Sequence, residues 1–352
     1  MSGYMAYCRA GFEGELVKEL QQEASAAGVL GYAQTQKDGG LVHYQAVDNS
    51  SMQSQLQSLS VHRLVFARQL WVHWQTLDEL DVSDRISPIL AACEGLPVCG
   101  ELRVEYPDTT EGRELSRFCR KFTVPLRQAL RGKGVLTKKE QASKPVLFAF
   151  FTHSRQVHLG VGLPENISPE PLGILRLKSP SEAPSRSTLK LDEALQLFLT
   201  SAERDQRLQP GMHGVDLGAC PGGWTYQLVR RGIFVQAVDN GAMADSLMET
   251  GLVQHYSADG FKYEPRKKPV NWLVCDMVES PLRVARLMAQ WLERRWCQEA
   301  IFNLKLPMKK RYESVTEARE LIAEILAGHE YRLSIKHLYH DREEVTCHLS
   351  SR

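Results

Sequence analysis

The fold is decided by the stretch Val215-Asp216-Leu217-Gly218-Ala219-Cys220-Pro221-Gly222-Gly223-Trp224, where an apolar run gives way to a glycine-rich turn. Residues 212–217 have the composition of a buried strand, and residues 224–229 after the turn have that of a helix. Another apolar run, residues 233–238, follows and ends at Asp239. This order predicts a strand–helix–strand unit in which a ligand can approach the backbone N–H groups that begin the helix.

The residue types in this turn distinguish between two kinds of cofactor. A dinucleotide-binding turn carries GxGxxG, whose second glycine admits the pyrophosphate, and Cys220 stands at that position here. The pattern Asp-x-Gly-x-x-Pro-Gly-Gly-Trp over residues 216–224 instead resembles motif I of S-adenosylmethionine-dependent methyltransferases. Asp239 is then placed to bind the ribose diol, and Asp259 suits the position that contacts the adenine. We therefore predict S-adenosylmethionine as the cofactor.

The residues after the fourth strand of this domain bear on which atom receives the methyl group. Enzymes that methylate exocyclic amines usually carry (D/N)PP(Y/F) there, whereas this chain has Asp276-Met277-Val278-Glu279. Cytosine-C5 enzymes need a cysteine nucleophile that commonly follows a proline, and neither Cys275 nor Cys220 does so. We expect both cysteines to be small buried apolar residues.

Methylation of a ribose 2′-hydroxyl requires a base for a weakly acidic proton. A lysine can serve only if its pKa falls well below its ordinary value of about 10.4, and burial or a neighbouring ammonium group lowers it. Two lysines beside a carboxylate can supply a base, a positioning cation and an orienting anion. The chain offers these groups at strand and helix ends of one domain: Lys190, Asp276, Lys305 and Glu344.

A second motif, Ser185-Arg186-Ser187-x-x-Lys190-Leu191-Asp192-Glu193, together with the glycine-rich turn, resembles the FtsJ-like ribose 2′-O-methyltransferases. The resemblance implies a Lys-Asp-Lys-Glu tetrad in which Lys305 accepts the proton and Asp276 orients it. Glu344 fills the last position through a Glu-Val step before a strand, and Glu343 competes with it. The resemblance also implies these cofactor-binding residues: Ser187, Asp216, Gly218, Cys220, Pro221, Gly222, Gly223, Trp224, Asp239, Asp259 and Asp276.

Residues 118–127, 303–312 and 340–346 narrow the resemblance to the bacterial large-subunit rRNA methyltransferase M group. This group implies 2′-O-methylation of one cytidine of 23S rRNA, without a metal, by a protein with an N-terminal THUMP module. An RNA base methyltransferase and a non-catalytic assembly factor with a relic cofactor pocket are the alternatives. A methyl group on a base instead of a ribose would identify a base methyltransferase. Absence of any methyl transfer would favour the assembly factor.

The predicted fold class is α/β, with a Rossmann-like class I methyltransferase domain after an α+β THUMP-containing region that binds RNA. Five of the 16 prolines lie in residues 163–184, which indicates a connector. The predicted domains are therefore a ferredoxin-like subdomain over 1–55, a THUMP domain over 56–162, and the methyltransferase domain over 185–352. Within the N-terminal region we expect strands at 64–67 and 69–74.

Charge is uneven along the 352 residues, although the total is only +1. Residues 1–112 carry 7 basic and 15 acidic residues, whereas residues 113–144 carry 10 basic and 2 acidic ones. A net charge near zero excludes a protein that binds nucleic acid by overall positive charge alone, but it does not exclude an RNA-binding protein. The basic segment, residues 113–144, has Phe118 and Phe122 among its basic residues, which is typical of a nucleic-acid-binding surface. We expect Pro125 to kink or end the helix in this segment. The predicted RNA contacts are Arg113, Arg117, Arg120, Lys121, Arg127, Arg131, Lys309, Lys310 and Arg311.

The N-terminus shows no signal-peptide pattern, and the sequence has no apolar run of the roughly 20 residues that a membrane helix needs. The eight cysteines are scattered without CxxC pairs, so we expect neither structural zinc nor a disulfide framework. We therefore expect a cytoplasmic protein without membrane or metal, acting on 23S rRNA as a monomer or weak homodimer.

Overall fold

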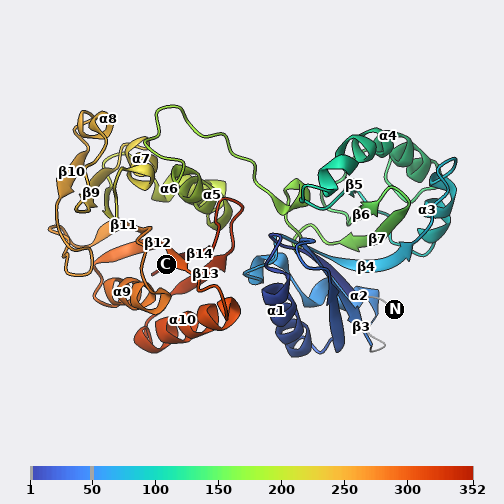
Figure 1. The fold of residues 1–352 in the computed structure, drawn as a ribbon, viewed down its shortest axis with the longest axis horizontal. Helices are drawn as coiled ribbons and strands as arrows, with labels where there is room; N and C mark the ends of the chain where they lie inside the picture. The colour runs from blue at the N-terminus through green and yellow to red at the C-terminus, as the bar shows by residue number, and fades with distance from the viewer. Residues whose placement is uncertain (1–2, 48–50, 352) are drawn as a thin grey trace. The chain divides into compact units, whose positions relative to one another are not determined.

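The computed structural model describes residues 3–47 and 51–351. The chain divides into two compact units, Met1–Leu175 and Arg176–Arg352. Figure 1 shows the first unit in blue to green and the second in green to red. No helix in the described part of the chain is long and apolar enough to cross a bilayer. The finer domain limits and the THUMP assignment stay predictions.

The N-terminal unit contains one seven-stranded sheet in the order β2-β3-β1-β4-β7-β6-β5. All neighbouring strands are antiparallel except β5 and β6, which are parallel. The strands are β1 Gly3–Tyr7, β2 Gly31–Thr35, β3 Leu41–Ala46, β4 Gln69–Leu77, β5 Glu101–Glu105, β6 Val146–His153 and β7 Gln156–Gly162. The helices are α1 Glu13–Ala26, α2 Met52–Ser58, α3 Ile86–Ala92 and α4 Ser116–Gly132, with short 3-10 turns at Val61–Arg63, Gly112–Leu115 and Pro171–Gly173.

Residues 64–67 are not a strand, so that prediction was wrong. They are buried, as their apolar composition indicates, but they connect a 3-10 turn to β4. The Glu19 carboxylate accepts the N–H groups of Val65 and Phe66 at 2.5 and 2.9 Å. A side chain on α1 therefore satisfies backbone donors that a sheet would otherwise satisfy.

Helix α4 continues through Pro125 instead of ending there. Proline removes one backbone donor from the helix, but Cys119, Leu126 and Leu130 on both sides of it are buried. This apolar packing holds the helix together across the proline.

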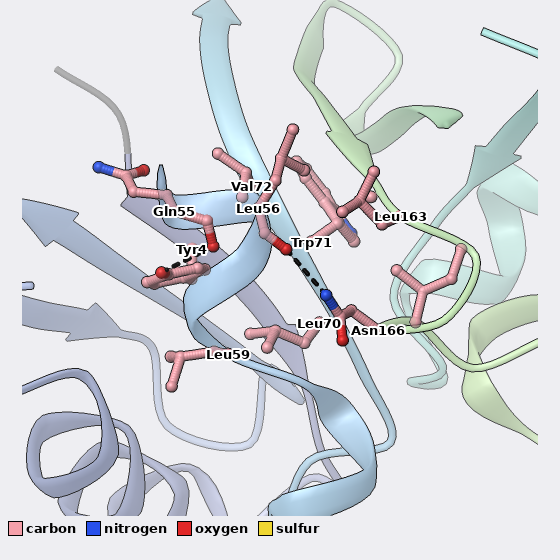
Figure 2. A pocket seen from close by; sticks show the side chains of 11 residues that line it. Tyr4, Gln55, Leu56, Leu59, Leu70, Trp71, Val72, Leu163 and Asn166 are labelled. Carbon is pink, nitrogen blue, oxygen red and sulfur yellow. Dashed lines mark hydrogen bonds between the residues drawn. The ribbon is translucent and has the colours of Figure 1, made fainter. Parts of the chain in front are cut away.

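A small cavity lies between α2 and β4 in the N-terminal unit, lined by Tyr4, Leu56 and Trp71 among others (Figure 2). The Tyr4 hydroxyl donates to the Gln55 carbonyl at 3.0 Å, and the Asn166 amide donates to the Leu56 carbonyl at 2.9 Å. The cavity volume is about 10 Å³, which is space for one water molecule. It is a packing gap beneath α2 and is too small for a nucleotide cofactor.

The C-terminal unit contains a second seven-stranded sheet in the order β10-β9-β8-β11-β12-β14-β13. The first five strands in this order are parallel, and β14 is antiparallel to both neighbours. The strands are β8 His213–Leu217, β9 Phe234–Val238, β10 Val253–Tyr256, β11 Val270–Cys275, β12 Cys297–Lys305, β13 Arg332–Lys336 and β14 Glu344–Ser350.

Helices cover both faces of this sheet (Figure 1). They are α5 Thr188–Phe198, α6 Ser201–Arg207, α7 Gly223–Val229, α8 Asp245–Met248, α9 Pro281–Glu293 and α10 Arg311–Ile325. Leu195 of α5 and Leu228 of α7 share a core with Trp272, Val274 and Ile301 of the sheet. A mainly parallel sheet between helix layers confirms the predicted Rossmann-like α/β class.

The strand order changes direction between β8 and β11. From β8 the chain proceeds outward to β9 and β10, and then returns to place β11 on the other side of β8. In open α/β sheets, ligands bind at such a switch point, outside the carboxyl ends of the strands. The glycine-rich turn follows β8 and Asp276 follows β11, so both predicted halves of the site lie at this edge.

Candidate active site

The turn after β8 is shaped by glycines that no other residue can replace without strain. Gly218 and Gly222 have φ values of +79° and +117°, in the left-handed region. A Cβ at Gly218 would lie 2.6 Å from Met277 Cγ, and a Cβ at Gly222 would lie 2.2 Å from Leu247 Cδ1. Glycine at both positions therefore lets the backbone of the turn pack closely against Met277 and Leu247 at the start of α7.

Serines from the second motif lie against the start of α7. A Cβ at Gly223 would meet Ser187 Oγ at 2.2 Å and Ser185 Oγ at 2.4 Å. The two hydroxyls are hydrogen-bonded to each other at 2.6 Å. Two sequence motifs 30 residues apart therefore meet at the helix N-terminus, where hydroxyls and N–H groups suit a carboxylate or another polar ligand group.

Two buried polar atoms at this turn point to a ligand. Asp216 accepts a hydrogen bond from the Thr225 hydroxyl at 2.6 Å through one carboxyl oxygen. Its other oxygen and the indole Nε1 of Trp224 are buried without a hydrogen-bond partner within the described ranges 3–47 and 51–351. Buried polar atoms are normally paired. These unpaired atoms beside the glycine-rich turn fit a polar cofactor such as S-adenosylmethionine.

The Asp216 carboxyl is nearly inaccessible, with 1% of its surface exposed. Burial raises its pKa to about 7, with a smaller contribution from the Asp276 carboxylate and against the effect of the Thr225 hydrogen bond. The unfolded chain loses this proton near pH 4, whereas the folded protein keeps it up to about pH 7. The unfolding free energy should therefore fall as pH rises from 4 to 7 and level off above that.

We expect Asp216→Asn to remove this part of the pH dependence. Asparagine still accepts the Thr225 hydrogen bond but does not ionise, so the stability difference between variant and wild type should shift by a few kcal/mol in favour of the variant between pH 4 and 7. Urea unfolding of both proteins across pH 4–8 measures this. A difference that stays constant over that range would show that Asp216 ionises normally in the fold.

The acidic residues after β9 and β10 occupy different environments. The Asp239 carboxylate accepts the N–H groups of Cys220 and Gly241 at 3.0 and 2.8 Å, so it is fixed against the glycine-rich turn. Asp259 is exposed and accepts the N–H of Phe261 at 2.9 Å. Both lie at the carboxyl edge of the sheet, but their contacts with a cofactor stay predictions.

Cys220 corrects one expectation. It is exposed rather than buried, whereas Cys275 is buried as expected. The Cys220 thiol donates to the Ala242 carbonyl at 3.0 Å. The residue is exposed because it belongs to the turn itself, where the backbone leaves the sheet edge.

Strand register assembles the other half of the site. Antiparallel pairing places Lys305 of β12 opposite Glu344 of β14, and Asn303 opposite Thr346. Residues two apart on a strand share a face, so these four side chains lie together. Asp276 follows the end of β11, whose last residue pairs with Phe302 of β12.

The structure brings Lys190, Asp276, Lys305 and Glu344 into contact. Lys305 Nζ lies 2.5 Å from Asp276 Oδ1 and 4.0 Å from Glu344 Oε1. Lys190 Nζ, from the first turn of α5, lies 3.6 Å from Asp276 Oδ2 and also contacts Glu344 Oε1. Each carboxylate is thus shared between the two lysines.

The two adjacent glutamates face different partners. Glu343 accepts a hydrogen bond from Arg311 Nη2 at 2.5 Å, and its side chain is 57% exposed. Glu344 is 8% exposed and faces both lysines. Of the two candidates, Glu344 is the one placed among the other three residues.

Lys190 is suited to remain an ammonium ion. Burial lowers its pKa, but the Asp276 and Glu344 carboxylates outweigh burial and bring the pKa above its ordinary value. A lysine held in this state neutralises the surrounding carboxylates and cannot accept a proton. Lys305 contacts the same two carboxylates, so its assignment as the base rests on the family resemblance.

Several residues at the site lie within the stretches that carry the resemblance, but no role was predicted for them. Asn303 Nδ2 donates to Asp276 Oδ1 at 2.8 Å, and Thr346 and Asp341 lie behind Asn303. Glu193, one turn beyond Lys190 on α5, accepts the N–H groups of Tyr339 and His340 at 2.8 and 2.9 Å. It thereby fixes the loop that leads to Glu344. The available signal was polar residues at period two inside apolar strands, at 303 and 346.

The basic segment forms one exposed face of α4 and the turn before it. Arg113, Arg117, Arg120 and Lys121 are exposed, whereas Arg127 and Arg131 are half-buried. Arg127 lies 4.0 Å from Glu140, and Arg131 donates to the Thr137 carbonyl at 3.2 Å. In the C-terminal unit, Lys309 and Lys310 are exposed, and Arg311 is held by Glu343 as described above.

The two phenylalanines of this segment do not belong to the basic face, which corrects the expected interleaving. Phe118 and Phe122 stack at 5.3 Å and both meet Phe151 of β6 edge-on, at 5.0 and 5.5 Å. Their spacing of four places them on the helix face that packs on the sheet. The face is therefore basic without exposed aromatic rings.

The fold and the site define an S-adenosylmethionine-dependent methyltransferase of the Rossmann-like class. Residues 1–71 match the RlmM ferredoxin-like domain, residues 84–163 match the N-terminal region of ribosomal RNA large subunit methyltransferase M, and residues 183–325 match the FtsJ-like methyltransferases. The chain belongs to the ribosomal RNA large subunit methyltransferase M family.

Relatives of this name cover the whole chain. Ribosomal RNA large subunit methyltransferase M of Pseudoalteromonas atlantica is 54% identical, covering 99% of each chain, and that of Psychromonas ingrahamii is 53% identical, covering 99% of this chain and 96% of its own. The crystal structure of TrmN from Thermus thermophilus covers 99% of each chain at 16% identity with a TM-score of 0.36, too low to add to the argument.

Proposed function

We propose that the protein transfers a methyl group from S-adenosylmethionine to the ribose 2′-hydroxyl of one cytidine in 23S rRNA. The observation that carries the proposal is the cluster of Lys190, Asp276, Lys305 and Glu344 beside the glycine-rich turn. Two lysines and two carboxylates in contact can deprotonate a hydroxyl. The names of the relatives indicate large-subunit rRNA as the substrate. Cytidine rests on the family resemblance alone.

In the proposed mechanism, Lys305 Nζ accepts the 2′-hydroxyl proton while the ribose oxygen forms its bond to the methyl carbon. The Asp276 carboxylate, 2.5 Å from Lys305 Nζ, aims that nitrogen and stabilises the ammonium ion that it becomes. Lys190 stays charged and balances Asp276 and Glu344. When bound, S-adenosylmethionine would supply a methyl group activated by its sulfonium, with the S–C bond exchanged for the new O–C bond.

The cofactor would be held by the residues around the glycine-rich turn. Asp216 and Trp224 offer the unpaired buried atoms, and Ser187 and the Gly218–Gly223 backbone line the start of α7. Asp239, Asp259 and Asp276 complete the set at the neighbouring strand ends.

RNA would be held by the exposed cations. The basic face of α4 is the main candidate, with Lys309 and Lys310 beyond the end of β12 near Lys305. We further propose that the protein works in the cytoplasm as a monomer or weak homodimer.

The test is incubation of the protein with labelled S-adenosylmethionine and 23S rRNA from cells that lack this activity. The product is digested to nucleosides, and the methylated position is mapped. We expect one 2′-O-methylcytidine. Label on a base would establish the rival RNA base methyltransferase, and no transfer to either free rRNA or ribosomal particles would favour the assembly factor.

A further inference from the structure

A line of buried side chains runs from the reaction site into the sheet. Asn303 Nδ2 donates to Asp276 Oδ1 at 2.8 Å, and the Thr346 hydroxyl lies 2.7 Å from Asn303 Oδ1. Behind it, both carboxyl oxygens of Asp341 lie within 3.1 Å of Thr346 Oγ1. Asn303, Asp341 and Thr346 are each 0% exposed. The Asp341–Thr346–Asn303 chain therefore ends on the carboxylate that Lys305 contacts.

The chemistry of these groups gives the chain a direction. Asp276 lies between two lysines, so it is a carboxylate and can only accept a hydrogen bond from Asn303, whose NH₂ must face it. The Asn303 oxygen then faces Thr346, whose single hydroxyl proton must be donated to it. Thr346 Oγ1 is left as an acceptor toward Asp341. A hydrogen bond there requires that Asp341 carry a proton.

The surroundings of Asp341 favour its protonated form. Burial and the Glu344 carboxylate raise the pKa of Asp341 well above its ordinary range, and Glu193 acts in the same direction. Lys190 and the Leu338 N–H, which donates to Asp341 Oδ2 at 3.0 Å, act against this without reversing it. A neutral Asp341 can donate to Thr346 while it accepts from Leu338.

We propose that Asp341, Thr346 and Asn303 are positioning residues for methyl transfer, through hydrogen bonds donated in sequence from Asp341 to Asp276. The inference rests on the proposed function, because it concerns the carboxylate that orients the proposed base. The chain keeps the Asn303 amide turned toward Asp276. Asp276 is then held in place for Lys305 by three buried residues, and hydrogen-bond networks among buried groups fix geometry.

The experiment compares variants that break the Asp341–Thr346–Asn303 hydrogen-bond chain with variants that preserve it. Thr346→Val removes the hydroxyl while keeping the shape, and Asn303→Ala removes the donor to Asp276. Thr346→Ser keeps the hydroxyl. Asp341→Asn keeps a donor for Thr346 and an acceptor for Leu338 but cannot be an anion. For each, kcat, the KM values for S-adenosylmethionine and rRNA, and the thermal midpoint are measured.

We expect Thr346→Val and Asn303→Ala to lower kcat at least tenfold, with both KM values within threefold of wild type. Thr346→Ser and Asp341→Asn should keep kcat within threefold. The proposal is overturned if Thr346→Val retains the wild-type kcat, or if Asp341→Asn is as impaired as Thr346→Val, because the second result would require an anionic Asp341.

Equal loss in all variants together with a lowered thermal midpoint would show a purely structural role and would also overturn the proposal. If Thr346→Val does not fold, Asn303→Ala against Asp341→Asn gives the same comparison. Nucleoside analysis of the wild-type product separates this question from the proposed function, because a methylated base would refute ribose methylation while the ranking of variants still reports on the chain.

Discussion

Lys305→Ala is expected to lower methyl transfer by about three orders of magnitude, because a positioned general base contributes roughly 10²–10⁴-fold to the rate. Lys305 Nζ lies at the end of β12, 2.5 Å from Asp276 Oδ1, whereas Lys190 Nζ lies 3.6 Å from Asp276 Oδ2. The cofactor turn after β8 does not include Lys305. S-adenosylmethionine affinity should therefore stay within about twofold of wild type, measured by calorimetry beside the transfer assay.

Two further variants separate the proton acceptor from the positive charge. Lys305→Arg keeps a cation beside Asp276 but cannot give up its proton, and it should be as inactive as Lys305→Ala. Lys267→Ala removes an exposed lysine in the loop before β11 and should keep most of the rate. Normal transfer by Lys305→Ala would refute the mechanism, and normal transfer by Lys305→Arg would assign Lys305 a purely electrostatic role.

Replacement of Arg117, Arg120 and Lys121 by glutamine is expected to weaken rRNA binding by tenfold to a hundredfold. Each lysine or arginine that contacts a phosphate releases counterions, so the loss of three contacts should flatten the dependence of log K on log salt by about two to three. The three side chains are exposed on one face of α4. Filter binding of 23S rRNA fragments between 50 and 200 mM salt measures both quantities.

The matched control removes three exposed cations elsewhere in the chain: Arg230, Lys267 and Arg294. It changes the net charge equally, so it reports the general electrostatic effect. The α4 assignment fails if the two triple variants have the same affinity and the same salt slope. Neither triple variant touches the cofactor turn, so S-adenosylmethionine binding serves as the test of folding for both.

The sequence predicted those parts of the site that depend on parallel strands. The carboxyl ends of such strands meet at one edge, so the turn after residue 217 and Asp276 could be placed together from strand ends alone. The motif over residues 185–193 also predicted Lys190 as a site residue. The family resemblance supplied Lys305 and Glu344, which pair across the antiparallel strands β12 and β14. The pairing of Asn303 with Thr346 was not predicted, because it depends on the strand register.

Errors in the N-terminal unit have the same origin. The apolar run at 64–67 has strand composition, but Glu19, which lies 46 residues from Val65, binds its N–H groups. Phe118 and Phe122 read as part of a basic surface, but packing on Phe151 turns them inward. In each case a distant residue decided the outcome, as tertiary contacts commonly do.

Because β14 lies between β12 and β13, we expect catalytic activity and cofactor binding to be lost at different temperatures. Glu344 and Thr346 belong to a hairpin with the edge strand β13, whereas the cofactor turn is anchored on the central strand β8. Proteins open locally before they unfold globally, and edge elements are among the first to open. Fraying of the β13–β14 hairpin would silence the chemistry while the cofactor stays bound, so inactivation on warming would precede loss of the cofactor.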